Sequence, residues 1–173
     1  MRRAVIALGC AGAVLVPAPR APIAAPRADP PAAAAVAYAA PVLPAVVVRA
    51  FQAPPAPYAA GHRGVDLATA PSQVVRAAGL GRVRFAGAVA GRGVVVIEHP
   101  DGVLTEYEPV TVVVSAGEPV SRGQPIGRVQ GRHGACGTGR CVHWGARRHG
   151  VYVDPMTLLL GLGPVRLLPW RGP

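Results

Sequence analysis

The chain has 173 residues and a formal net charge of +10, with 18 basic residues against 8 acidic ones. A length of this kind allows one domain with additional segments. All of the basic residues are arginine, which indicates either an anionic partner or a base bias in the gene, with the charge then serving only solubility. The first third is almost entirely Ala, Pro and Val with scattered Arg. We therefore expect the hydrophobic core to be built by the rest of the chain.

The N-terminus has the order of a secretory signal peptide. Arg2 and Arg3 precede an apolar stretch over residues 4–17, and small residues and prolines follow. The alternative is a membrane anchor, but the apolar run is shorter than the ~20 residues that span a bilayer. We expect a signal peptide over residues 1–30, with cleavage between Ala18 and Ala40, and no stable membrane span in the mature chain.

Export sets the expected location and partners. The protein is then secreted or extracytoplasmic and associated with the cell wall, so wall polymers or acidic lipid surfaces, and not nucleic acid, are the expected anionic partners. Residues 31–57 form an Ala/Pro-rich linker without a periodic pattern, which we expect to be disordered. The folded domain is expected over residues 58–162, followed by a C-terminal tail over residues 163–173.

The folded part is rich in strand signals. Short runs of β-branched or alternating residues, separated by Gly, Pro and Asp turns, predict strands over residues 73–78, 81–87, 93–99, 103–108 and 142–147. A helix period is seen only over residues 155–160. The sequence therefore predicts an all-β domain, an antiparallel sandwich or a barrel-like sheet.

Residues 114–127 contain a distinctive hairpin pattern. Glycines at positions 117, 123 and 127 place two tight turns around a short apolar strand. Such hairpins occur in barrel-sandwich hybrid folds, including biotinyl and lipoyl carriers. A carrier needs an exposed lysine for its prosthetic group, and because this chain has none, that function is excluded.

His62, Asp66 and His143 form a split set of candidate zinc ligands. Two nitrogens and one carboxylate oxygen would leave the fourth tetrahedral position open for water, which is the arrangement of a catalytic zinc site. Each residue also has an ordinary alternative, since His62 could belong to a turn and His143 could be a half-buried histidine with a hydrogen-bond partner.

The cysteines add a second question about this site. Once Cys10 is removed with the signal peptide, Cys136 and Cys141 remain, and in an exported protein this spacing favours a disulfide that closes a small loop. Cys141 also lies two residues before His143, on the same face of the expected strand. If its thiolate bound zinc instead, the site would be closed and structural.

The ordered set of motifs resembles the lysostaphin/LytM-type peptidoglycan endopeptidases, and the resemblance extends over residues 61–160. It is carried by His62-x-x-x-Asp66, Ala77-x-x-Gly-x-Gly-x-Val83, His99-x-Asp-Gly102, Tyr107, Gly117-Glu-Pro-Val-x-x-Gly-Gln-x-Ile-Gly127, His143-Trp-Gly145 and Val153-Asp-Pro155. This family implies a duplicated hybrid motif fold, Zn²⁺ bound by His62, Asp66 and His143, and cleavage of wall peptides.

Two positions depart from the family pattern. The family's further histidines align with Pro109 and Cys141, so both groups that normally transfer protons beside the metal are replaced. The catalytic residues are therefore unknown from the sequence. The weak candidates for a replacement are Glu108, His133 and His149.

Two functions follow from this combination. The first is an exported zinc endopeptidase that cuts peptidoglycan cross-link peptides during wall remodelling, with a non-standard proton acceptor. The second is a catalytically silent LytM-type module that binds wall peptides or activates another wall hydrolase. Without the two histidines, an enzyme would lose roughly 10²- to 10⁴-fold for each missing acid or base.

Overall fold

The computed structural model describes residues 36–56, 58–131, 136 and 139–159, and in this part the chain forms eleven strands and one short helix. These are β1 (Val47–Arg49), β2 (Gly64–Thr69), β3 (Val74–Arg76), β4 (Gly81–Val89), β5 (Arg92–Glu98), β6 (Val103–Glu108), β7 (Val110–Val112), β8 (Pro119–Val120), β9 (Pro125–Val129), β10 (Arg140–Arg148), β11 (Val151–Val153) and α1 (Met156–Leu159).

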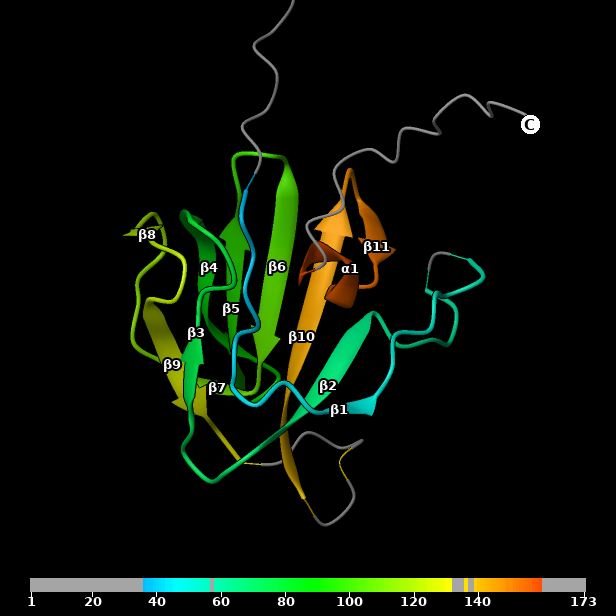
Figure 1. Ribbon diagram of the computed structural model, residues 1–173, viewed down its shortest axis with the longest axis horizontal. Coiled ribbons are helices and arrows are strands. Elements are labelled where there is room, and N and C mark those ends of the chain that lie inside the picture. Colours follow the sequence, from blue (N-terminus) through cyan, green and yellow to red (C-terminus); the bar gives the residue numbers. More distant parts are fainter. Residues whose placement is uncertain (1–35, 57, 132–135, 137–138, 160–173) are drawn as a thin grey trace, which may run out of the picture. The chain divides into compact units, whose positions relative to one another are not determined.

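The strands form two antiparallel sheets (Figure 1). The larger has the order β1-β2-β10-β6-β5-β4-β8, with β11 paired to β10, and the smaller has the order β3-β9-β7. Neither sheet closes on itself within the described residues, so the architecture is a sandwich and not a barrel. The predicted all-β antiparallel fold is therefore confirmed.

The hydrophobic core is built from side chains of both sheets. Along β10, Val142, Trp144 and Ala146 are buried and alternate with Cys141, His143, Gly145 and Arg147, which belong to the opposite face. Burial of large side chains such as Trp144 stabilises the fold by roughly 2–3 kcal/mol each. The members of this core include Val65, Leu67, Val75, Val83, Val95, Ile97, Tyr107, Val110, Ile126, Val129, Val142 and Trp144.

A directed chain of hydrogen bonds crosses this core. His99 Nδ1 lies 2.7 Å from the Leu80 carbonyl oxygen, which makes Nδ1 the donor and leaves Nε2 to accept from the Thr105 hydroxyl at 2.8 Å. Thr105 Oγ1 then accepts from the Tyr107 hydroxyl at 2.8 Å, and Tyr107 accepts from the Ala78 amide at 2.9 Å. Burial lowers the pKa of His99, which keeps its ring neutral as this chain requires.

The expectation of a disordered linker is wrong for residues 36–56. Val42 is 2% exposed within the core, β1 pairs with β2, and Gln52 forms an isolated bridge with His62. The Tyr38 hydroxyl also donates to Asp101 at 2.8 Å. Although the composition is low in complexity, its few large apolar side chains and its backbone groups are enough to attach it to the edge of the sheet.

Most of the predicted elements are present. The five predicted strands correspond to β3, β4, β5, β6 and β10, the hairpin contains β8 and β9, and the predicted short helix is α1. Strand β2 was not predicted although it carries Asp66. The signal peptide, residues 31–35 and the C-terminal tail lie outside the described residues. No helix in the described part is long and apolar enough to cross a membrane.

We predict that Thr105→Val destabilises the protein by about 2 kcal/mol, because it leaves buried polar groups of His99 and Tyr107 without partners. The free energy of unfolding, measured by urea denaturation, tests this. Thr111→Val is the matched control, since Thr111 is exposed on β7 and should change stability by less than about 0.5 kcal/mol. Equal effects of the two variants would contradict the role given to the hydrogen-bond chain.

Candidate metal centre

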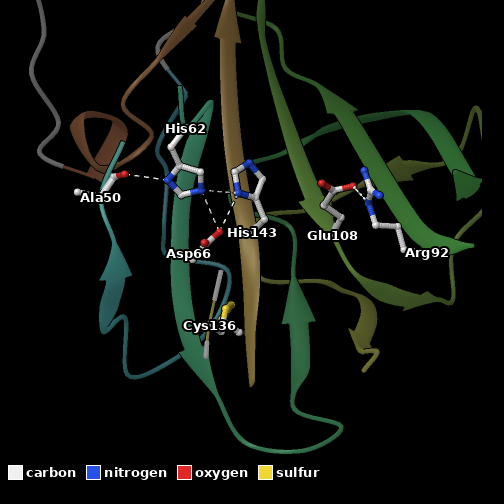
Figure 2. Close-up of polar contacts among 8 residues, drawn as sticks. Ala50, His62, Asp66, Arg92, Glu108, Cys136 and His143 are labelled. Carbon is white, nitrogen blue, oxygen red and sulfur yellow. Dashed lines mark hydrogen bonds and ion pairs between the residues drawn. A yellow bond between two sulfur atoms is a disulfide. The ribbon is translucent and has the colours of Figure 1, made fainter. Parts of the chain in front are cut away.

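His62, Asp66 and His143 converge on the face of the large sheet that points away from the core. Asp66 on β2 and His143 on β10 are direct partners in the register, and His62 lies two residues before the first residue of β2. The His62 Nε2 atom lies 3.1 Å from both Asp66 Oδ1 and His143 Nδ1, and the last two atoms are 2.9 Å apart (Figure 2). All three residues are buried.

The second nitrogen of His62 is fixed by the N-terminal segment. His62 Nδ1 lies 2.8 Å from the Ala50 carbonyl oxygen and donates to it (Figure 2). The backbone groups of Gln52 and His62 exchange two further hydrogen bonds, of 3.0 and 2.8 Å. Because Nδ1 carries the proton, the Nε2 lone pair of a neutral ring points toward Asp66 and His143, as a metal ligand requires.

The donor set fits a divalent cation. Three acceptor atoms meet within about 3 Å of one another, while His62 Nε2 brings no proton and Asp66 is an acceptor when ionised. Ligand atoms at ~2.0–2.2 Å from a tetrahedral zinc are separated by roughly 3.4 Å, so small outward shifts would accommodate the ion. These residues, with two imidazoles and one carboxylate, fit Zn²⁺ with one position open.

Cys136 and Cys141 are joined by a disulfide in the structure. Cys141 is fully buried on β10, on the face of His143, and the two sulfur atoms lie within 4.8 Å of an Asp66 carboxylate oxygen. The disulfide that the spacing favours is therefore the arrangement found. With both sulfurs bonded to each other, neither is a thiolate ligand, so a metal held by His62, Asp66 and His143 would keep a fourth position free of sulfur.

Glu108 lies on the same face as the candidate ligands. It is the direct partner of His143 across the β6–β10 pair, and side chains of direct partners point to the same side of a sheet. Its carboxylate accepts from Arg92 Nε at 2.8 Å (Figure 2). β6 ends at Glu108, so Glu108 is the last residue of this strand on the metal face.

Glu106 is a second acidic residue on this face, and the sequence reasoning missed it. It is the partner of Gly145, and its Oε2 lies 3.5 Å from the place where a Cβ on Gly145 would be. Its Oε1 pairs with Arg147 Nη2 at 3.3 Å. Burial raises the pKa of Glu106, while the charges of Arg147 and His143 oppose that shift. The signal that could have found it is the alternation of Glu106 and Glu108 around the buried Tyr107.

Of the other two candidates from the sequence, only His149 is among the described residues. His133 lies outside the described residues. His149 is exposed in the turn between β10 and β11 with a φ of 49°. A strand rises ~3.3 Å per residue, so His149 is about 20 Å along the chain direction from His143. Glu106 and Glu108 are thus the carboxylates that the sheet brings to the metal face.

A two-sheet antiparallel sandwich that brings two imidazoles and one carboxylate together on its outer face has the fold and residue set of a metallopeptidase-type domain. Residues 60–155 match the model of "Peptidase family M23". The chain belongs to peptidase family M23, which confirms the resemblance to lysostaphin/LytM-type enzymes and makes the domain a peptidase-type module related to peptidoglycan.

Known proteins resemble this chain over its folded part. An uncharacterised protein of Mycobacterium tuberculosis is 47% identical over 130 residues, which cover 73% of this chain and 52% of that protein. The chain thus spans about half the length of the curated relatives that it matches at this identity. A zinc-containing peptidase from Vibrio cholerae is 28% identical, with a TM-score of 0.57 over 69% of this chain and 39% of the other.

A structure of the SpoIIQ–SpoIIIAH pore-forming complex contains a further similar chain. It is 27% identical, with a TM-score of 0.61, and the match covers 73% of this chain and 92% of that chain. The fold therefore occurs both in a zinc-containing peptidase and in a protein–protein assembly.

We predict that the full chain binds one Zn²⁺. His62→Ala or His143→Ala should weaken zinc binding by at least about 100-fold, because each substitution removes one of the three protein ligands. Metal content after dialysis and competition with a chromophoric chelator measure this. His149→Asn is the control, since asparagine tolerates a positive φ, and it should bind zinc like the unchanged protein. Equal zinc affinity of all variants would refute the assigned ligands.

Proposed function

We propose that the protein is an exported zinc endopeptidase that acts on peptidoglycan cross-link peptides in cell-wall remodelling. The observation that carries the proposal is the convergence of His62 Nε2, Asp66 Oδ1 and His143 Nδ1 within about 3 Å, with the cysteine sulfurs held in a disulfide. Membership of family M23 supports a peptide substrate. The N-terminal pattern and the disulfide support an extracytoplasmic location.

A zinc ion in this site would supply a Lewis acid for the scissile carbonyl and a water of lowered pKa. The chain must then supply a group that takes the proton of this water. We assign this role to Glu106, whose carboxylate lies over Gly145, the second residue after His143 on β10. A carboxylate in a buried position is a stronger base than one in water, and the raised pKa of Glu106 agrees with the geometry.

Glu108 and Arg92 complete the proposed machinery. Glu108 lies in the same cross-strand row as Asp66 and His143, and its hydrogen bond with Arg92 at 2.8 Å fixes the carboxylate and places a cation near the row. The side chain of Glu108 is 19% exposed and that of Arg92 is 46% exposed. Glu108 is therefore a positioning residue that holds Arg92 beside this row.

A second candidate function is a silent module that binds wall peptides or a partner protein. It is favoured by the replacement of both usual histidines, at Pro109 and Cys141, and by the similarity to a chain of the SpoIIQ–SpoIIIAH complex. In this case, binding would persist in the presence of a chelator and no peptide would be cleaved.

We expect the zinc-loaded full chain to release soluble peptides from purified peptidoglycan, and we expect chelation or Asp66→Ala to abolish the release. Mass spectrometry of the products identifies the bond that is cut. Zinc bound at one equivalent without products from any wall preparation would refute the enzyme and support the silent module.

We further expect Glu106→Gln to lower kcat by at least about 100-fold, the usual contribution of a general base, with zinc content unchanged. Glu108→Gln is the matched control on the same strand and should lower kcat by less. Activity should also fall as the pH decreases through the raised pKa of Glu106, because the protonated carboxyl cannot accept a proton. A larger loss in Glu108→Gln than in Glu106→Gln would contradict the assignment.

A further inference from the structure

A pocket of about 810 Å³ lies against the end of β10 that follows the metal site. Its walls come from the N-terminal segment 53–56, from Arg63, and from β10 and β11 through Arg147, Val151 and Tyr152. Only Arg63 and Arg147 carry a formal charge among its described lining residues, and the segment 53–56 contributes alanine and proline. The pocket therefore combines two cations with an apolar wall.

Both guanidinium groups contact the ring of Tyr152. The Cζ atoms of Arg63 and Arg147 lie 5.7 and 5.6 Å from the centre of that ring, within the range of cation–π attraction. Tyr152 is thus a shared neighbour of the two guanidinium groups. Glu106 offsets part of the charge of Arg147 at 3.3 Å, so an anion bound in the pocket would gain chiefly from Arg63.

Each arginine keeps hydrogen-bonding capacity for a ligand. Arg63 Nη2 donates to the Ala59 carbonyl oxygen at 3.1 Å, and in the described part of the chain no carboxylate lies within salt-bridge distance of it. Arg147 pairs with Glu106 through Nη2, and its buried Nε has no acceptor among the described residues. The planar fork of donors on arginine matches the two oxygens of a carboxylate.

The pocket and the metal centre lie along the same face of β10. On this face, Gly145 follows His143 by two residues and Arg147 follows it by four. The His143 ring reaches over Gly64, since its Nε2 atom lies 2.8 Å from the place of a Cβ there, and Glu106 stands over Gly145. The strand rise places Arg147 about 13 Å along β10 from His143, a distance that an extended peptide covers in about four residues. A peptide that runs along this face past His143 and Glu106 would thus reach both sites.

We propose that the pocket formed by Arg63, Arg147 and Tyr152 is a subsite for a carboxylate of the peptide that lies across the metal centre. This inference rests on the proposed function, because it takes a peptide as the ligand. The carboxylate binds between the guanidiniums, and the aliphatic part next to it packs on the Ala/Pro wall. The enzyme therefore selects peptides with a free carboxylate, at the C-terminus or on a side chain, about four residues from the bond at the metal.

Three synthetic peptides test the subsite with the full chain. They are N-acetyl-tetraalanine with a free C-terminal carboxylate, its C-terminal amide, and this amide with glutamate in place of the third alanine. Affinities are measured calorimetrically in low salt with zinc and again with excess chelator, so that a carboxylate bound by zinc is distinguished from one bound by arginine. We expect at least one carboxylate peptide to bind about 10-fold more tightly than the amide in both conditions.

The variants separate this subsite from general charge effects. Arg63→Gln should reduce the preference for the carboxylate to nearly onefold, and Arg63→Lys should keep part of it. Arg84→Gln is the control, because it also removes one positive charge, from an arginine that is 73% exposed on β4, and it should leave the preference unchanged. Zinc content should not change in any of these variants, which separates loss of the subsite from loss of the metal.

The peptide-binding measurements test the carboxylate subsite without requiring that the protein cleaves a peptide. A preference for the C-terminal carboxylate or for glutamate that persists with chelator and is lost in Arg63→Gln supports it and identifies the source. Equal or undetectable binding of the three peptides, or a preference that disappears with chelator, overturns it. If hydrolysis fails but the preference is found, the proposed catalysis is wrong and the subsite remains.

Discussion

The register of β10 between β2 and β6 is the constraint on which the site depends. It places Asp66, His143 and Glu108 in one row on the outer face, while Trp144 and Val142 enter the core from the same strand. Because side chains alternate along a strand, a shift by one residue would exchange these two sets. Burial of Trp144 therefore fixes the row of candidate ligands as much as it stabilises the sandwich.

The three candidate ligands named from the sequence are brought together by the structure, whereas the neighbouring carboxylate of Glu106 was missed. His62, Asp66 and His143 stood out because they belong to an ordered set of motifs, since each alone has an ordinary alternative. Glu106 belongs to no motif, and its importance comes from Gly145 on another strand, a contact that requires knowledge of the pairing. Glu108 was named as a candidate, but its pairing with His143 on β10 could not be read from the sequence.

The composition left two explanations for the net positive charge, an anionic partner or a base bias in the gene. In the fold, several of the arginines have specific neighbours. Arg92 pairs with Glu108 and Arg147 with Glu106, while Arg63 and Arg147 share the ring of Tyr152. Of these arginines, Arg92 and Arg147 are paired with carboxylates, whereas Arg63 contacts only the Tyr152 ring and a backbone carbonyl among the described residues.

The attachment of residues 36–56 also bears on how the domain is delimited. The match to the family begins at residue 60, yet the carbonyl that orients His62 belongs to Ala50, and Val42 occupies the core. A fragment that starts at the family boundary would retain the three ligands and lose the acceptor that selects the tautomer of one of them. For this protein, the folded unit therefore begins before the region that defines its family.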